Sequence, residues 1–281
     1  MHKVIDSNHL QDERLRRFLQ QSARNKAVLP DFLGIEGYNG DLRIHLQWMD
    51  ILADFPNQVI ILKGSALLTR MSGRRSGLVR RLIDEESTKG FPEHITAVKA
   101  AQGGNTHALA QVEGLRKDAA DHLSKMDEEA VDIIPAMEEL GRMFTKEERA
   151  IIRAGNTYTK DMIGKLTTNL FSVSAVMIGS SSRRRSFDDD IVNTFAFRTA
   201  LAMFALMMDR TAQGGLSGMK PSKLRNDFVD MIFVAYGTFF DGILTADTRL
   251  RKIFDDVCVL LFGLYKGHIT EGYDPFNREE F

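Results

Sequence analysis

The chain has 281 residues, of which 43% are hydrophobic and 27% charged, and its 37 basic and 38 acidic residues give a net charge of -1. This ordinary globular composition excludes a uniformly basic coat for nucleic acid, although a local basic groove remains compatible with it. The single cysteine, Cys258, excludes a disulfide framework and fits a reducing compartment. The N-terminus is charged, and no apolar run approaches the roughly 18 residues of a membrane span, so we expect a soluble, cytoplasmic protein.

The predicted elements are short strands separated by helices. Hydrophobic spacing predicts a helix over 10–21, a strand over 27–29, a helix over 41–55 and a strand over 59–62. From 65 to about 215 the spacing is helical, with breaks near 103–104, 135 and 179–182. The remainder predicts a helix over 224–239, a strand over 242–244, a short helix over 249–254 and a last strand over 257–262. Strands joined through helices predict an α/β fold with a parallel sheet wound with helices.

Acidic residues follow two of these strands and begin the helix before the third. They are Asp31, Glu36, Asp227, Asp230 and Asp247. Ligands of parallel sheets bind at the carboxyl ends of the strands, where these acids are expected to meet. Clustered carboxylates repel one another unless a cation neutralises them, and Mg²⁺ or Mn²⁺ prefers such oxygen ligands. The alternative for each acid is a local role, as a helix cap or as a solvated residue in a first helical turn.

Two stretches resemble a PIN-domain nuclease. LRNDFVDMIFVAYGTFFDGILTADTRL, at 224–250, resembles its C-terminal half, with an acidic helix, a short strand and a "T-x-D" end, and AVLPDFLGIEGY, at 27–38, resembles its opening strand. The resemblance implies one PIN-like domain over 1–281, with core parts 26–63 and 216–265 and a helical insertion over about 65–215. Most members follow the first aspartate with a small hydroxyl or amide residue, whereas Phe32 and Leu33 follow Asp31 here.

The resemblance also implies a metal-dependent endoribonuclease, of the kind found among toxins and defence effectors, with RNA as substrate and DNA left open. Asp31, Asp230 and Asp247 would be catalytic ligands of Mg²⁺ or Mn²⁺. Asp227 and Glu36 would supply the fourth acid or support the ligands, because no mid-domain glutamate is assigned. Asn226 and Thr245 would orient the ligands through hydrogen bonds.

A basic stretch follows the second predicted strand and is the candidate for substrate contact. It comprises Lys63, Arg70, Arg74, Arg75, Arg80 and Arg81, broken by glycines. Such residues contact phosphates and make binding depend on salt. The alternative is a solvated surface whose charges are compensated locally.

Two other functions stay open. The first is a non-catalytic interaction protein on a degenerate nuclease scaffold, whose long helices bind a regulatory partner or form a homo-oligomer. The second rests on Arg116 and His122, whose spacing resembles the Arg-to-His motif of the helical, metal-free HEPN ribonucleases.

Overall fold

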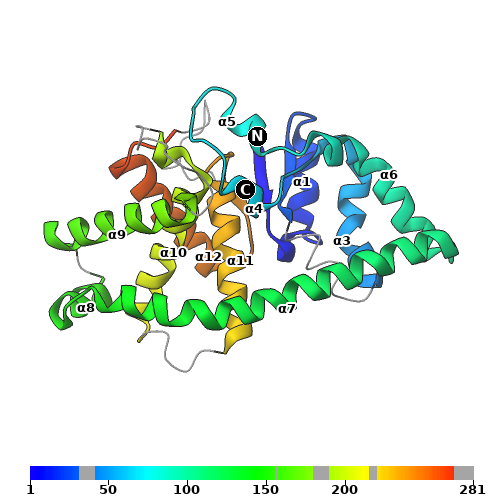
Figure 1. The fold of residues 1–281 in the computed structure, drawn as a ribbon. Helices are drawn as coiled ribbons and strands as arrows, with labels where there is room; N and C mark the ends of the chain where they lie inside the picture. Colours follow the sequence, from blue (N-terminus) through cyan, green and yellow to red (C-terminus); the bar gives the residue numbers. More distant parts are fainter. Residues whose placement is uncertain (32–41, 156, 180–189, 215–219, 269–281) are drawn as a thin grey trace.

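Four short parallel strands form one sheet in this protein, whose computed structural model describes residues 1–31, 42–155, 157–179, 190–214 and 220–268 (Figure 1). The strands are β1 (His2–Ile5), β2 (Lys26–Leu29), β3 (Val59–Ile61) and β4 (Ile243–Leu244), in the order β3-β2-β1-β4. β1 is central, and its Val4 pairs with Val28 on one side and with Ile243 on the other. The predicted α/β fold with a parallel sheet is confirmed.

The sheet differs from the sequence prediction at both ends of the chain. β1 precedes the strand that we predicted as the first, and it carries only two apolar residues, Val4 and Ile5, which are fully buried. The strand predicted over 257–262 is wrong, because this segment continues α12 (Thr248–Cys258) into a π-helix (Val259–Leu264). A short apolar run does not distinguish a strand from a buried helix. Here the buried positions Leu250, Ile253, Val257 and Leu261 recur at helical spacing.

Helices make up most of the remaining structure. They are α1 (Glu13–Gln21), α3 (Leu42–Asp54), α4 (Ser65–Leu68), α5 (Leu78–Leu82), α6 (Glu85–Gln102), α7 (Thr106–Arg142), α8 (Lys146–Arg153), α9 (Lys160–Gly179), α10 (Phe195–Ala212) and α11 (Pro221–Gly237). Short 3-10 helices lie at Ser7–His9, Pro56–Gln58 and Ile191–Asn193. In the described part of 65–215 no strand forms, as predicted, apart from an isolated antiparallel bridge between Leu62 and Ile83. The break predicted at 135 is wrong, since α7 continues through Pro135.

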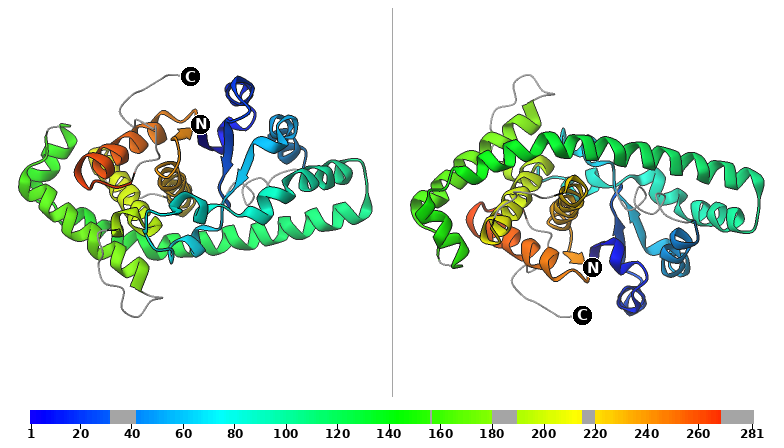
Figure 2. Two further views of the ribbon diagram at one scale, coloured as in Figure 1. Left: turned by 90° about the horizontal axis from the view of Figure 1, so that it is seen from above. Right: turned by 90° about the horizontal axis from the view of Figure 1, so that it is seen from below.

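The long helix α7 runs along one side of the molecule and joins its parts (Figures 1 and 2). It contacts α6 near one end and α10 and α11 further along. α10 is buried over most of its length and packs against α8, α9, α11 and α12. α11 in turn contacts β1 and β4, so the helical part and the sheet share one core. No helix among the described residues is long and apolar enough to cross a membrane.

Candidate metal-binding site at the strand ends

The carboxyl ends of β1 and β4 bring Asp6 beside Thr245. The two strands pair through Ile5 and Leu244, and the amide of Asp6 donates to the carbonyl of Leu244 at 3.0 Å. The hydroxyl of Thr245 donates to Asp6 Oδ2 at 2.5 Å and accepts from the backbone N–H of Asp247 at 3.0 Å. One buried threonine therefore connects the carboxylate that ends β1 to the loop that carries Asp247.

Asp6 is an uncompensated acid in a buried position. Its side chain forms no ion pair with any described residue, although only 7% of the residue is exposed. Burial raises the pKa of Asp6, the hydrogen bond from Thr245 opposes this shift, and the negative charge of Asp247 adds to it. Such a carboxylate is stabilised when a cation approaches it.

Asp247 caps α12 and keeps one oxygen for other contacts. Its Oδ1 accepts from the backbone N–H groups of Arg249 at 2.7 Å and Leu250 at 3.1 Å, which is the usual role of aspartate before a helix. Its Oδ2 makes no hydrogen bond with the part of the chain that the structure describes, and the residue is exposed. Capping of α12 and binding of a cation by Asp247 are therefore compatible.

Asp31 follows β2, the strand next to β1, and belongs to a second group of contacts. Its Oδ2 accepts from the backbone N–H of Ser65 at 3.0 Å, and its Oδ1 lies 3.4 Å from the hydroxyl of Tyr236. The same hydroxyl donates to the carbonyl of Lys63 at 2.8 Å, so Tyr236 links the ends of β2 and β3. Burial raises the pKa of Tyr236, and Asp31 adds to this shift. Tyr236 thus stays a neutral donor.

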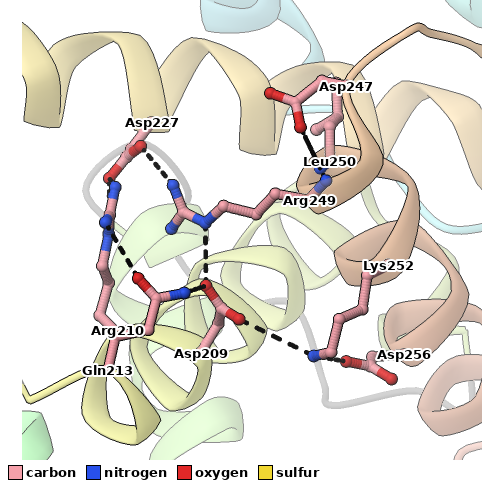
Figure 3. A network of polar contacts seen from close by, with 9 residues as sticks. All are labelled: Asp209, Arg210, Gln213, Asp227, Asp247, Arg249, Leu250, Lys252 and Asp256. Carbon is pink, nitrogen blue, oxygen red and sulfur yellow. Dashed lines mark hydrogen bonds and ion pairs between the residues drawn. The ribbon is translucent and has the colours of Figure 1, made fainter.

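Asp227 lies in a buried ion network between α10, α11 and α12 (Figure 3). Its Oδ2 accepts from Nε of Arg210 at 3.0 Å and also from Nη2 of the same guanidinium. Its Oδ1 accepts from Nη1 of Arg249 at 3.0 Å. Both carboxylate oxygens of Asp227 are therefore neutralised by arginines of this chain.

The network continues outward through Asp209. Arg249 Nε donates to Asp209 Oδ2 at 2.9 Å, and Lys252, 3.8 Å from Asp209, pairs at 3.1 Å with Asp256 at the surface. Burial alone would lower the pKa of Arg249, but its bonds to Asp209 and Asp227 outweigh this effect and raise it.

The other predicted ligands and supporting residues are Asp230, Asn226 and Glu36. Asp230 is half-buried on α11, and Asn226 is exposed and accepts from the guanidinium of Arg225 at 3.0 Å. Glu36 lies outside the described residues. Within the described ranges no three His, Cys, Asp or Glu side chains are grouped closely enough to hold a metal ion by themselves.

The predicted basic stretch divides into two sets. Lys63 and Arg74 line a pocket of about 500 Å³ together with Arg80 and Arg81. Arg70 and Arg75 are exposed and do not line it. In α7, Arg116 pairs with Glu113 at 3.3 Å, and the side chain of His122 is outside the described part.

The fold and the strand ends define an α/β protein with a four-stranded parallel sheet and an acidic pair where β1 and β4 end. Comparison with protein-family models finds none that matches the chain. No curated protein and no solved structure matches it either.

Asp6 is the site residue that the sequence analysis missed. A usable signal was present, because the apolar pair Val4-Ile5 is followed by Asp6 and then by Ser7-Asn8. The pair is too short to predict a strand by periodicity, and only its pairing with two neighbours shows that it is one.

Proposed function

We propose that this chain is a metal-dependent endoribonuclease of PIN-like type, with Asp6 and Asp247 as the ligands of Mg²⁺ or Mn²⁺. The observation that carries the proposal is the acidic pair at the ends of two adjacent parallel strands, joined through Thr245 and without an ion-pair partner in the described part of the chain. Ligands of parallel sheets bind at this edge.

The donor set fits a hard divalent cation. Mg²⁺ is commonly held by one or two carboxylates, with waters and substrate phosphates completing its coordination, so a cage of three protein acids is not required. When bound, the metal would supply an activated water and neutralise charge on the scissile phosphate. Thr245 would hold Asp6 and the backbone of Asp247 in place through its two hydrogen bonds.

Asp6 also supports the resemblance to PIN-domain nucleases. Ser7 and Asn8 follow it, which are the small hydroxyl and amide residues that most members have after their first aspartate. Asp6 thus takes the role that we first gave to Asp31. Asp31 and Asp230 remain proposed as further acids of the site, whereas Asp227 belongs to the ion network.

A non-catalytic interaction protein is the second candidate function. The observation that favours it is the neutralisation of Asp227 by Arg210 and Arg249, since a carboxylate with both oxygens bound by arginines is not available to a metal. On this alternative the sheet is a degenerate nuclease scaffold, and the long helices bind a partner or a second copy.

The test is cleavage of single-stranded and structured RNA by the purified full chain in Mg²⁺ or Mn²⁺, with and without EDTA. We expect EDTA, Asp6→Asn and Asp247→Asn each to abolish cleavage. Asp256→Asn, which changes an exposed acid of α12, serves as the matched control and should leave the rate unchanged.

Binding of Mn²⁺ measured by calorimetry gives a readout that does not depend on turnover. We expect binding to the unmodified chain and a loss of affinity of at least about tenfold in Asp6→Asn. Cleavage that persists in EDTA and fails in His122→Ala would transfer the function to the HEPN-like alternative. Absence of both Mn²⁺ binding and cleavage would favour the interaction protein.

A further inference from the structure

The pocket at the end of β3 is lined by basic side chains and is separate from the acidic pair. Its lining includes Lys63, Arg74, Arg80 and Arg81, and the one acid among its described lining residues is Glu85, which pairs with Arg80 at 2.9 Å. Its volume of about 500 Å³ falls in the range of small-molecule sites. The pocket therefore combines positive charge with a size suited to one small anionic group and its neighbouring atoms.

Two of these cations are held in place by backbone carbonyls and form no ion pair with the described residues. The guanidinium of Arg81 donates to the backbone carbonyls of Ser72, at 3.1 Å, of Arg74 and of Ser76. Lys63 Nζ donates to the carbonyl of Arg81 at 3.1 Å. Neither side chain forms an ion pair with a carboxylate of the described residues, although Lys63 interacts electrostatically with Asp84 and Glu85.

The loop between α4 and α5 contributes Arg74, Ser76 and Gly77 to the pocket and is fixed by close packing. A Cβ atom on Gly73 would lie 1.8 Å from the carbonyl oxygen of Asp190, so the loop backbone rests directly on the segment before α10. The antiparallel bridge between Leu62, which follows β3, and Ile83, which follows α5, joins the two ends of the segment that contains this loop. The backbone that carries the basic side chains of the pocket is therefore held in place before a ligand binds.

We propose that this pocket binds a phosphate monoester at the end of a nucleic-acid strand. A monoester carries about -1.5 to -2 charges at neutral pH, whereas an internal diester carries one, and the stronger charge matches several cations opposed by one carboxylate. Arginine and lysine are the usual side chains for such a group. The pocket lies at the same edge of the sheet as the acidic pair, and β3 is two strands from β1 and three from β4, which corresponds to roughly 10 to 14 Å between the strands.

The consequence for function rests on the proposed nuclease activity: a strand whose end is held in the pocket would be cut a short, fixed distance from that end. The binding itself does not rest on it. We therefore test binding in EDTA, where failure of the nuclease proposal cannot affect the result.

Fluorescence anisotropy would compare one labelled RNA with a 5′-phosphate, a 3′-phosphate or hydroxyls at both ends. We expect at least one phosphorylated form to bind about tenfold more tightly than the hydroxyl form, the effect of a hydrogen-bonded charge. Arg74→Gln and Lys63→Gln should remove this preference. Arg70→Gln and Arg75→Gln, exposed arginines of the same segment outside the pocket, are the matched controls and should keep it.

Equal binding of the three RNAs, or equal loss in the control variants, would overturn the pocket assignment. Competition with adenosine monophosphate distinguishes the two sources of a phosphate monoester. We expect it to compete only at concentrations well above those of the phosphorylated RNA. Competition at equal concentration would overturn the assignment to a strand end and identify a free nucleotide as the occupant.

Discussion

Two acidic regions meet at the start of α12, and they differ in whether their carboxylates are paired with arginines. In the ion network, Asp227 is bound by two arginines and Asp209 by Arg249 (Figure 3). At the strand ends, Asp6 is bound by a threonine hydroxyl and forms no ion pair with the described residues. Asp247 and Arg249 are two residues apart, and one belongs to each region.

This difference separates structural acids from the acids proposed to bind metal. Buried charges that the fold satisfies hold helices together, and their removal leaves a partner unpaired. A buried acid that the fold does not neutralise lowers the stability of the apo protein and gains from an external cation. Substitutions of acids in the two regions should therefore change the stability of the apo protein in different directions.

Asp227→Ala should cause the largest loss of stability. It leaves Arg210, whose side chain is 8% exposed, and Arg249 without their shared carboxylate, and breaking a buried pair in this way costs about 3–5 kcal/mol. Chemical denaturation would measure the free energy of unfolding. Asp256→Ala, at the exposed end of the same network, should cost about 0–1 kcal/mol, and equal losses in the two variants would contradict the comparison.

Asp6→Asn should not reduce the stability of the apo protein, in contrast to Asp227→Ala. Asparagine keeps an oxygen that can accept from Thr245 and removes a buried charge that lies near Asp247, so the free energy of unfolding should stay equal or rise. Mn²⁺ should raise the melting temperature of the unmodified chain and not that of the variant. A marked loss of apo stability in Asp6→Asn would make Asp6 a structural acid like Asp227.

Substitutions of Asp247 test whether its cap of α12 can be separated from its charge. Asp247→Ala removes the cap of α12 and should cost about 0.5–2 kcal/mol, whereas Asp247→Asn should preserve most of the stability, because asparagine caps helices equally well. Thermal unfolding would measure both. Equal losses in the two variants would show that the charge, and not the cap, supports the fold.

Mild acid should affect the strand-end region before the network. His9, in the 3-10 helix after β1, is 1% exposed, and burial lowers its pKa below the usual 6.5. As the pH falls through about 6.5, His9 therefore takes up a proton in the unfolded chain before it does so in the folded chain. The contribution of His9 to the free energy of unfolding is complete above that pH and declines below it. The network of Figure 3 contains no histidine. His9→Gln should flatten the fall of unfolding free energy between pH 7.5 and 5.5, and an unchanged slope would contradict this.

The candidate site could be predicted in part from the sequence. Thr245 and Asp247 follow an apolar pair and precede a helix, and this local pattern predicted both their position at a strand end and the capping that the structure confirms. Asp227 was predicted to face the sheet edge as a ligand. Its arginine partners lie 17 residues before it and 22 after it in the chain, so no local pattern could reveal them.

Elements with a local signal can be predicted from the amino-acid sequence alone. The strands at Lys26–Leu29, Val59–Ile61 and Ile243–Leu244 and the long helices follow from hydrophobic spacing, which each segment carries within itself. The strand at His2–Ile5 and the helical state of the segment after Cys258 depend instead on tertiary contacts. A four-residue strand gains its stability from the hydrogen bonds and burial that two neighbours provide, and a buried apolar run takes the conformation that its surroundings can pack. Asp6 becomes a candidate ligand for this reason: pairing with β4, 239 residues away along the chain, places its carboxylate beside Thr245.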